Sequence, residues 1–192
     1  MGQARLEAFS DGVIAIIITI MVLELKVPHG ESLDSLAPLR PVFLSYVLSF
    51  VYVGIYWNNH HHLLQVVERV NGRVLWANLH LLFWLSMIPF VTGWSGESQF
   101  AAVPVASYGV VLFMAAVAYF ILTRTLLGSH ARDSRLARAL GSDAKGRLSA
   151  LLYAAAIPLA LVSAWLSLAI YATVALIWLV PDTRISKVAQ GH

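Results

Sequence analysis

Long apolar runs, separated by short polar segments, dominate the chain. The first run lies within residues 5–27 and has only one polar side chain, Thr19, between Gly12 and Leu23. Three more runs cover residues 41–64, 74–94 and 103–127. At 1.5 Å per residue, about 20 residues cross a hydrocarbon core of roughly 30 Å. The pattern therefore predicts four transmembrane helices, and Pro89 should kink the third of them.

The last apolar block, residues 148–180, is too long for a single span. As one helix it would be about 50 Å long, against a core of roughly 30 Å. Pro158 could kink one long helix, but a hairpin near residues 163–167 uses the block better. We therefore expect spans five and six at 147–163 and 165–181.

Composition agrees with a membrane-embedded chain. Hydrophobic residues make up 59% of the sequence and charged residues 12%, with a mean hydropathy of +0.74. A soluble globule of 192 residues needs more polar surface than this. The fold class expected is an all-α integral membrane protein, a single six-helix transmembrane domain over residues 1–192. The chain has no cysteine, which excludes disulfides and thiol chemistry.

Basic residues predict the orientation. With six spans and the N-terminus inside, all of the 13 lysines and arginines except Lys26 and Arg40 flank the inner ends, many of them in a basic cytoplasmic linker, 128–146. We expect a multi-pass protein of the cell membrane with both termini cytoplasmic. The net charge of +3 is then a topology signal with contacts to bilayer lipid, and it requires no nucleic acid. The N-terminus is not expected to be a cleaved signal peptide, because Glu7 and Asp11 interrupt it.

Polar residues from three spans fall at one depth in this topology. Ser10 and Asp11 lie near the inner end of span one, and span two and span three bring Trp57, Asn58, the three histidines 60–62, Asn78 and His80. An intramembrane carboxylate is costly and is therefore expected to be paired. We expect Asp11 to anchor an interhelical network with His61 and Asn78 as donors. The helical phase leaves His60 or His62 open as the partner instead.

The triple histidine does not predict a metal site. Three consecutive residues on a helix point about 100° apart and cannot converge on one ion. An intramembrane enzyme is not expected either, because neither HExxH nor GxSxG spacing occurs. No cofactor is expected.

The string RLEAFSD, residues 5–11, matches the RxxxFSD signature of the transmembrane protein 175 family of potassium channels. Arg5, Phe9, Ser10 and Asp11 occupy its fixed positions. Residues 57–61 and 78–90 are similar to the polar and proline positions of the family, and the single set of six spans looks like its prokaryotic branch. The resemblance implies a homotetramer in which the first helix lines the pore. The sequence also lacks a TVGYG-like filter.

The resemblance further implies which residues control the pore. The narrowest constriction would be Ile16, five residues after the signature aspartate. Ile20 and Leu23 continue the same helical face as a hydrophobic gate, and Thr19 lies on it as a polar layer. Periodicity cannot identify the lining face by itself, because almost every neighbouring position is also apolar.

The implied function is passive permeation of potassium with modest selectivity over sodium. The alternatives are a secondary transporter, or a channel that also passes protons. A transporter would need a midplane substrate site and commonly an internal repeat. The sequence shows no convincing repeat, and the middle of the first span carries no charged residue.

Overall fold

The computed structural model describes residues 2–65, 67, 70–129 and 144–179, and every regular element in these ranges is helical. The α-helices are α1 (Gln3–Met21), α2 (Arg40–Gln65), α3 (Gly72–Ser86), α4 (Ile88–Glu97), α5 (Ala102–Gly128), α7 (Ala144–Leu159) and α8 (Ala164–Leu179). Two 3₁₀ segments, Val22–Glu24 and Leu33–Leu39, extend α1 and precede α2. Taking α3 and α4 as one interrupted rod, the described chain forms six helical rods.

Four of these rods are long and apolar enough to cross a membrane: Gln3–Glu24, Leu33–Gln65, Gly72–Glu97 and Ala102–Gly128. The third is interrupted at Met87, just before Pro89. Proline lacks the backbone N–H that an uninterrupted helix requires, and its ring displaces the carbonyl four residues earlier. The chain is an all-helical membrane protein, as its composition predicted.

The last apolar block forms a hairpin of two short helices. The turn lies at residues 160–163, just before the position expected from the sequence, and Pro158 sits in the last turn of α7. Each helix has 16 residues, about 24 Å. Of the linker, residues 130–143 lie outside the described residues, and residues 144–146 already belong to α7. The basic positions Arg184 and Lys187 also lie outside the described residues.

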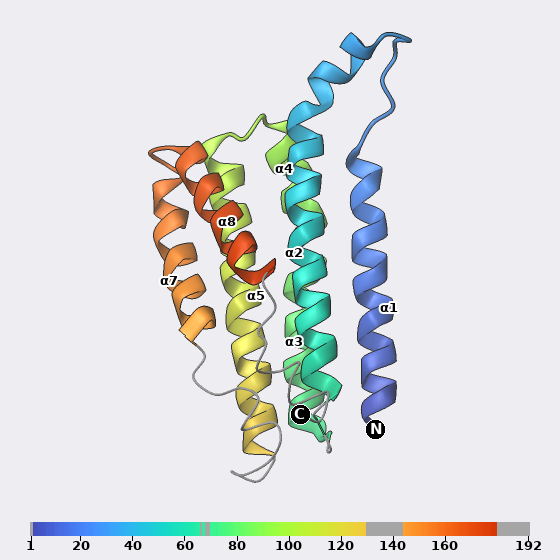
Figure 1. The fold of residues 1–192 in the computed structure, drawn as a ribbon, viewed down its shortest axis with the longest axis vertical. Coiled ribbons are helices and arrows are strands. Elements are labelled where there is room, and N and C mark those ends of the chain that lie inside the picture. The colour runs from blue at the N-terminus through green and yellow to red at the C-terminus, as the bar shows by residue number, and fades with distance from the viewer. Residues whose placement is uncertain (1, 66, 68–69, 130–143, 180–192) are drawn as a thin grey trace.

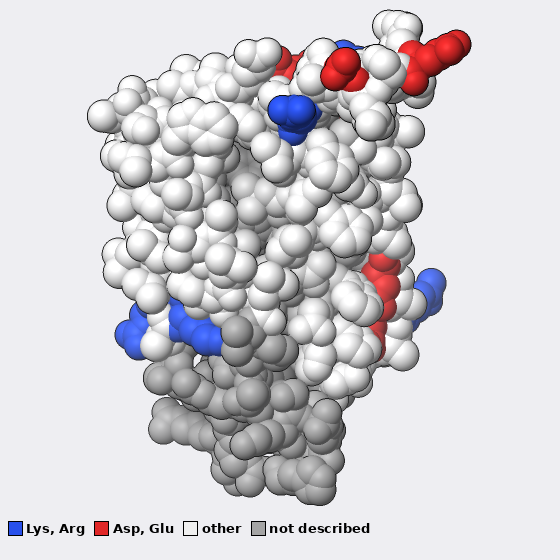
Figure 2. All heavy atoms as spheres, turned by 45° about the horizontal axis from the view of Figure 1, so that its top comes forward, with Lys and Arg blue, Asp and Glu red and all other residues white. Residues whose placement is uncertain are grey.

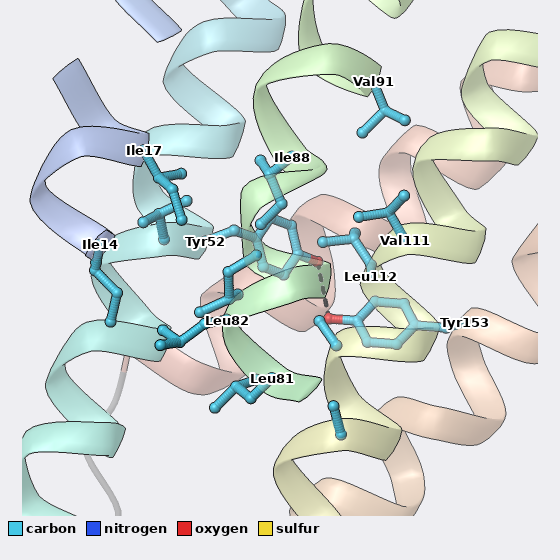
Figure 3. Packing of buried hydrophobic residues seen from close by; sticks show 14 of the residues in the cluster. Ile14, Ile17, Tyr52, Leu81, Leu82, Ile88, Val91, Val111, Leu112 and Tyr153 are labelled. Atoms are coloured by element: carbon cyan, nitrogen blue, oxygen red, sulfur yellow. Dashed lines mark hydrogen bonds between the residues drawn. The ribbon is translucent and has the colours of Figure 1, made fainter. Parts of the chain in front are cut away.

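The rods stand side by side, with α1 at one edge of the bundle and α7 at the other (Figure 1). Helix α1 packs against α2, α3 and α4, and α5 lies against α3, α4, α7 and α8. Figure 3 shows Ile14 and Ile17 of α1 pointing into the shared core, whose far side holds Leu112 and Tyr153. One face of α1 is therefore part of the core of its own chain.

Hydrogen bonds between tyrosines fasten the half of the bundle away from α1. Tyr153 donates to the hydroxyl of Tyr52 across 3.2 Å (Figure 3), and Tyr52 donates to the backbone carbonyl of Tyr171 across 2.5 Å. Gly109 makes room for this cluster, because a Cβ there would lie 2.0 Å from the Tyr171 hydroxyl. These contacts join α2, α7 and α8 and bring α8 close to the α5 backbone.

Charged side chains gather at the two ends of the molecule, leaving a wide uncharged belt between them (Figure 2). Among the described residues, the end where α1 begins carries the basic residues Arg5, Arg73, Arg124, Lys145 and Arg147. The opposite end carries Lys26 and Arg40 with several acids. There the Lys26 ammonium forms an ion pair with Glu97, which raises the pKa of Lys26.

Candidate functional site

Helix α1 has two opposite stripes with different surroundings. Leu6, Ser10, Ile14, Ile17 and Met21 are buried against the rest of the chain. These positions recur every three or four residues, which places them on one face of the helix. The other face carries residues that no part of the described chain covers. One face of α1 is thus packed and the other is open.

The predicted constriction residues lie on the open face. Ile16 is 60% exposed, Ile20 41% and Leu23 74%, whereas Ile14 and Ile17 are at most 2% exposed. Thr19 is exposed between them, and its hydroxyl donates to the carbonyl of Ile16 across 2.9 Å. With its proton engaged along the helix, the Thr19 oxygen presents lone pairs outward.

A buried hydrogen-bond relay joins α1 to α2 and α3. His60 Nε2 lies 2.7 Å from Asn78 Oδ1, and Asn78 Nδ2 donates to Ser10 Oγ across 2.9 Å. Ser10 in turn donates to the carbonyl of Leu6 across 2.8 Å. All three side chains are fully buried. Because every side chain of the relay is hydrogen-bonded to the next at a depth where water is scarce, the relay fixes how the three helices pack.

The direction of the relay assigns the histidine tautomer. Asn78 uses its amide N–H toward Ser10, so its carbonyl oxygen must accept from His60. His60 therefore carries its proton on Nε2. Its Nδ1 has no hydrogen-bond partner in the described part of the chain.

Asp11 forms a different contact from the one expected. It accepts a hydrogen bond from the indole nitrogen of Trp57 across 3.1 Å, and neither His61 nor Asn78 is its partner. The predicted pairing of Asp11 with those two residues was therefore wrong. The physical reason is helical phase: Trp57 faces α1 at the level of Asp11, while Asn78 is drawn to Ser10, one residue away.

His61 pairs instead with Glu7, which the sequence analysis did not place among the site residues. Its Nδ1 lies 2.8 Å from a Glu7 carboxylate oxygen, and its Nε2 lies 2.9 Å from Gln65. Its ring stacks on that of Trp57, with the centroids 6.0 Å apart. His62 bonds the carbonyl of Asn58 on its own helix. Of the three histidines, His60 is the one that enters the buried relay.

The remaining signature positions point away from these contacts. Arg5 and Phe9 are exposed on the open face of α1. Within the described chain the Arg5 guanidinium has neither an ion-pair nor a hydrogen-bond partner. The same ranges contain no group of three histidine, aspartate or glutamate side chains that could hold a metal ion.

The relay histidine could have been found from the serines of α2. Ser45 and Ser49 are small polar residues four apart on an apolar helix, and such residues mark a packed face in membranes. Continuing that face at helical spacing leads through Tyr52 and Tyr56 to His60. No comparable pattern identifies Glu7, because its partner depends on the register between two antiparallel helices.

Comparison with known proteins gives consistent matches. The family model described as "Endosomal/lysosomal potassium channel TMEM175" matches residues 5–89. A potassium channel of Chryseobacterium sp. (strain P1-3) is 55% identical, over 97% of each chain. One of Streptomyces collinus is 34% identical, over 91% of this chain and 90% of that one.

A solved structure also matches. The crystal structure of a lysosomal potassium-selective channel TMEM175 homolog from Chamaesiphon minutus superposes with a TM-score of 0.81. The two chains are 30% identical in sequence, and the match covers 94% of this chain and 97% of the other. The resemblance first carried by the RLEAFSD string is thereby confirmed over nearly the whole length. The chain belongs to the TMEM175 family.

Proposed function

We propose that this protein is a potassium channel that assembles as a homotetramer around a pore lined by α1. The observation that carries the proposal is the open stripe of α1. A single chain leaves Ile16 and Leu23 uncovered while it buries Ile14 and Ile17 on the opposite face. The bacterial relatives from Chryseobacterium and Streptomyces are themselves named as potassium channels. None of these relatives is named as an enzyme.

The gate that we propose is hydrophobic. Four copies of Ile16 facing one axis form an apolar ring, and an apolar ring narrower than a hydrated cation excludes water. Ile20 and Leu23 extend the ring by one and two turns toward the other end. Conduction then requires α1 to tilt or rotate until water follows the ion. The relay and the Trp57–Asp11 contact lie at the base of α1, so they set its resting position.

Selectivity in this proposal comes from partial dehydration and from Thr19. The Thr19 hydroxyl proton bonds the carbonyl of Ile16, so the oxygen can act only as an acceptor toward an ion. Four such oxygens replace part of a hydration shell, which favours the more easily dehydrated potassium ion. The preference over sodium is therefore modest.

We place the end where α1 begins in the cytoplasm of the cell. Five described basic residues gather at that end and two at the other, which follows the positive-inside bias. With six spans both termini are cytoplasmic, and α7 and α8 form the fifth and sixth spans.

The test is flux from liposomes that contain the purified protein. A potassium gradient should drive passive flux that needs no counter-substrate, with a smaller sodium flux under the same gradient. Flux that appears only with a second, opposing gradient would identify a transporter. Flux of protons alone would identify a proton channel. Mass photometry of the detergent-solubilised protein checks the tetramer.

A further inference from the structure

A partly open space lies between α2, α5, α7 and α8, on the side of the bundle away from α1. Its volume is about 240 Å³, and its walls are mostly apolar. The walls run from Tyr52 to Asn59 along α2 and from Tyr153 to Arg147 along α7. At 1.5 Å per residue this is about 10 Å along the helix axes. The cavity therefore runs along the membrane normal toward the basic end.

Helices α2 and α7 meet chiefly at Tyr52 and Tyr153, whose hydroxyls lie 3.2 Å apart, and away from that contact they leave the space open. Helix α8 packs against both α2 and α7. Trp178 near the end of α8 lines the space, and its indole donates to Ser149 of α7 across 2.8 Å. Ala116 and Ala150 also line the space, and side chains this small do not fill it.

The lining has the chemistry of an amphiphile site. Apart from the tyrosine hydroxyls, Ser149 and Asn59, the walls are hydrocarbon until the level of Arg147, an exposed guanidinium at the start of α7. The Tyr56 hydroxyl has no hydrogen-bond partner among the described residues. The volume is below that of sites for drug-sized molecules, about 300–1,000 Å³. A single flexible chain fits this space better than a bulky ring system does.

We propose that the cavity holds part of one acyl chain of an anionic phospholipid from the leaflet at the basic end, with the phosphate against Arg147. The basic residues beside the cavity favour an anionic headgroup. Arg147 and Lys145 lie at this end of α7, and basic sites between transmembrane helices on that side of a membrane bind anionic lipid headgroups. The deep end of the cavity is the tyrosine cluster, and Trp178 lies beside Ser149, nearer the basic end. This site is on the far side of α2 from α1, and the inference does not depend on channel activity.

Native mass spectrometry of the full-length protein in non-ionic detergent tests the site, with phosphatidylglycerol and phosphatidylcholine of identical chains as probes. The parent should bind phosphatidylglycerol more tightly. Arg147→Gln should weaken phosphatidylglycerol binding about five-fold, the size expected for one basic residue at an anionic surface, and leave phosphatidylcholine unchanged. Lys145→Gln, a matched charge change that does not line the cavity, should have less than about half that effect.

Two further variants fill the cavity from opposite walls. Ala150→Phe on α7 and Ala116→Leu on α5 should each reduce binding of both lipids, because the chain is excluded. Circular dichroism and size exclusion identify the variants that fold. If either well-folded variant binds lipid like the parent, the chain is not in this cavity. Equal losses in Arg147→Gln and Lys145→Gln would show diffuse attraction and overturn the site. If fatty acid alone co-purifies with the protein, the identification of the ligand as a phospholipid is wrong.

Discussion

The indole of Trp57 on α2 donates a hydrogen bond to the carboxylate of Asp11 on α1, across 3.1 Å. One turn away on both helices, His61 meets Glu7 at 2.8 Å. Because the two helices run antiparallel, residues four apart on α1 meet residues four apart on α2 in reverse order. The two contacts therefore form a register lock between the helices, beside the buried relay through Asn78.

The hydrogen bond from Trp57 can be removed while an aromatic side chain is kept at that position. Trp57→Phe deletes the N–H donor, and we expect it to lower the free energy of unfolding by about 0.5–1.5 kcal/mol, as for one hydrogen bond. Thermal stability in detergent measures the effect. Trp94→Phe is the matched control, because Trp94 is similarly exposed, at 40% against 44%, and its indole has no hydrogen-bond partner in the described chain. Equal shifts for both variants would mean that the hydrogen bond contributes nothing.

The buried relay should be more sensitive. Asn78→Leu leaves the Nε2–H of His60 without an acceptor, while Ser10 loses one bond but still donates to the Leu6 carbonyl. A buried group stranded as His60 is costs about 1–3 kcal/mol. Combining it with His60→Leu removes both sides of one contact, so the double variant should be less unstable than the two single effects summed. Thermal stability of the single and double variants gives the coupling. Asn78→Leu with Ser149→Ala, a remote site, should be additive; a coupling of the same size there would refute a local relay.

Ile16→Asn tests the hydrophobic gate. An amide hydrates the constriction, so basal potassium leak into liposomes should rise at least about tenfold, which corresponds to roughly 1.4 kcal/mol of barrier. Ile121→Asn makes the same change on the exposed surface of α5 and should leave the leak unchanged. If folded Ile16→Asn protein leaks no more than the parent, the barrier lies elsewhere on α1.

Thr19→Val tests the polar layer. The substitution keeps the side-chain shape and removes the oxygen, so the contribution of Thr19 to the preference for potassium over sodium should disappear while conductance remains. Reversal potentials in mixed potassium and sodium solutions report the change. Thr173→Val is the control, because that hydroxyl also donates to its own helix, to the carbonyl of Ala169, on α8. A reversal potential in Thr19→Val that matches the parent would exclude this role.

The apolar runs predicted the long helices of this fold well, because about 20 consecutive apolar residues specify a membrane-spanning helix without any tertiary contact. The position of the α7–α8 turn was less exact, since a block that is apolar throughout contains few local signals. Turn position there depends on packing, for example on Ser167, which donates to the carbonyl of Ala156 across the hairpin. Such a contact is invisible before the two helices are placed together.

The candidate site, like the fold, could be predicted from the sequence only in part. The sequence brought the correct helices to one depth, but it assigned Asp11 to His61 and Asn78 when its partner is Trp57. Depth follows from counting residues, whereas pairing requires the rotation of each helix to within about half of the 100° step between residues. The sequence pattern likewise could not show which face of α1 is open, because Ile14 and Ile16 are chemically identical and differ only in what surrounds them.

The polar contacts of α1 within the described chain end at Asp11 and resume only at Lys26, beyond the helix. Between them α1 touches its bundle through apolar side chains such as Ile17 and Met21. Lipid tails are as apolar as these side chains, so exchanging one contact for the other costs little. The rod Gln3–Glu24 has 22 residues, about 33 Å. A helix held by polar contacts only at its base, and by apolar packing along the rest of one face, adjusts to hydrophobic mismatch by tilting, so bilayer thickness should influence the slope of α1.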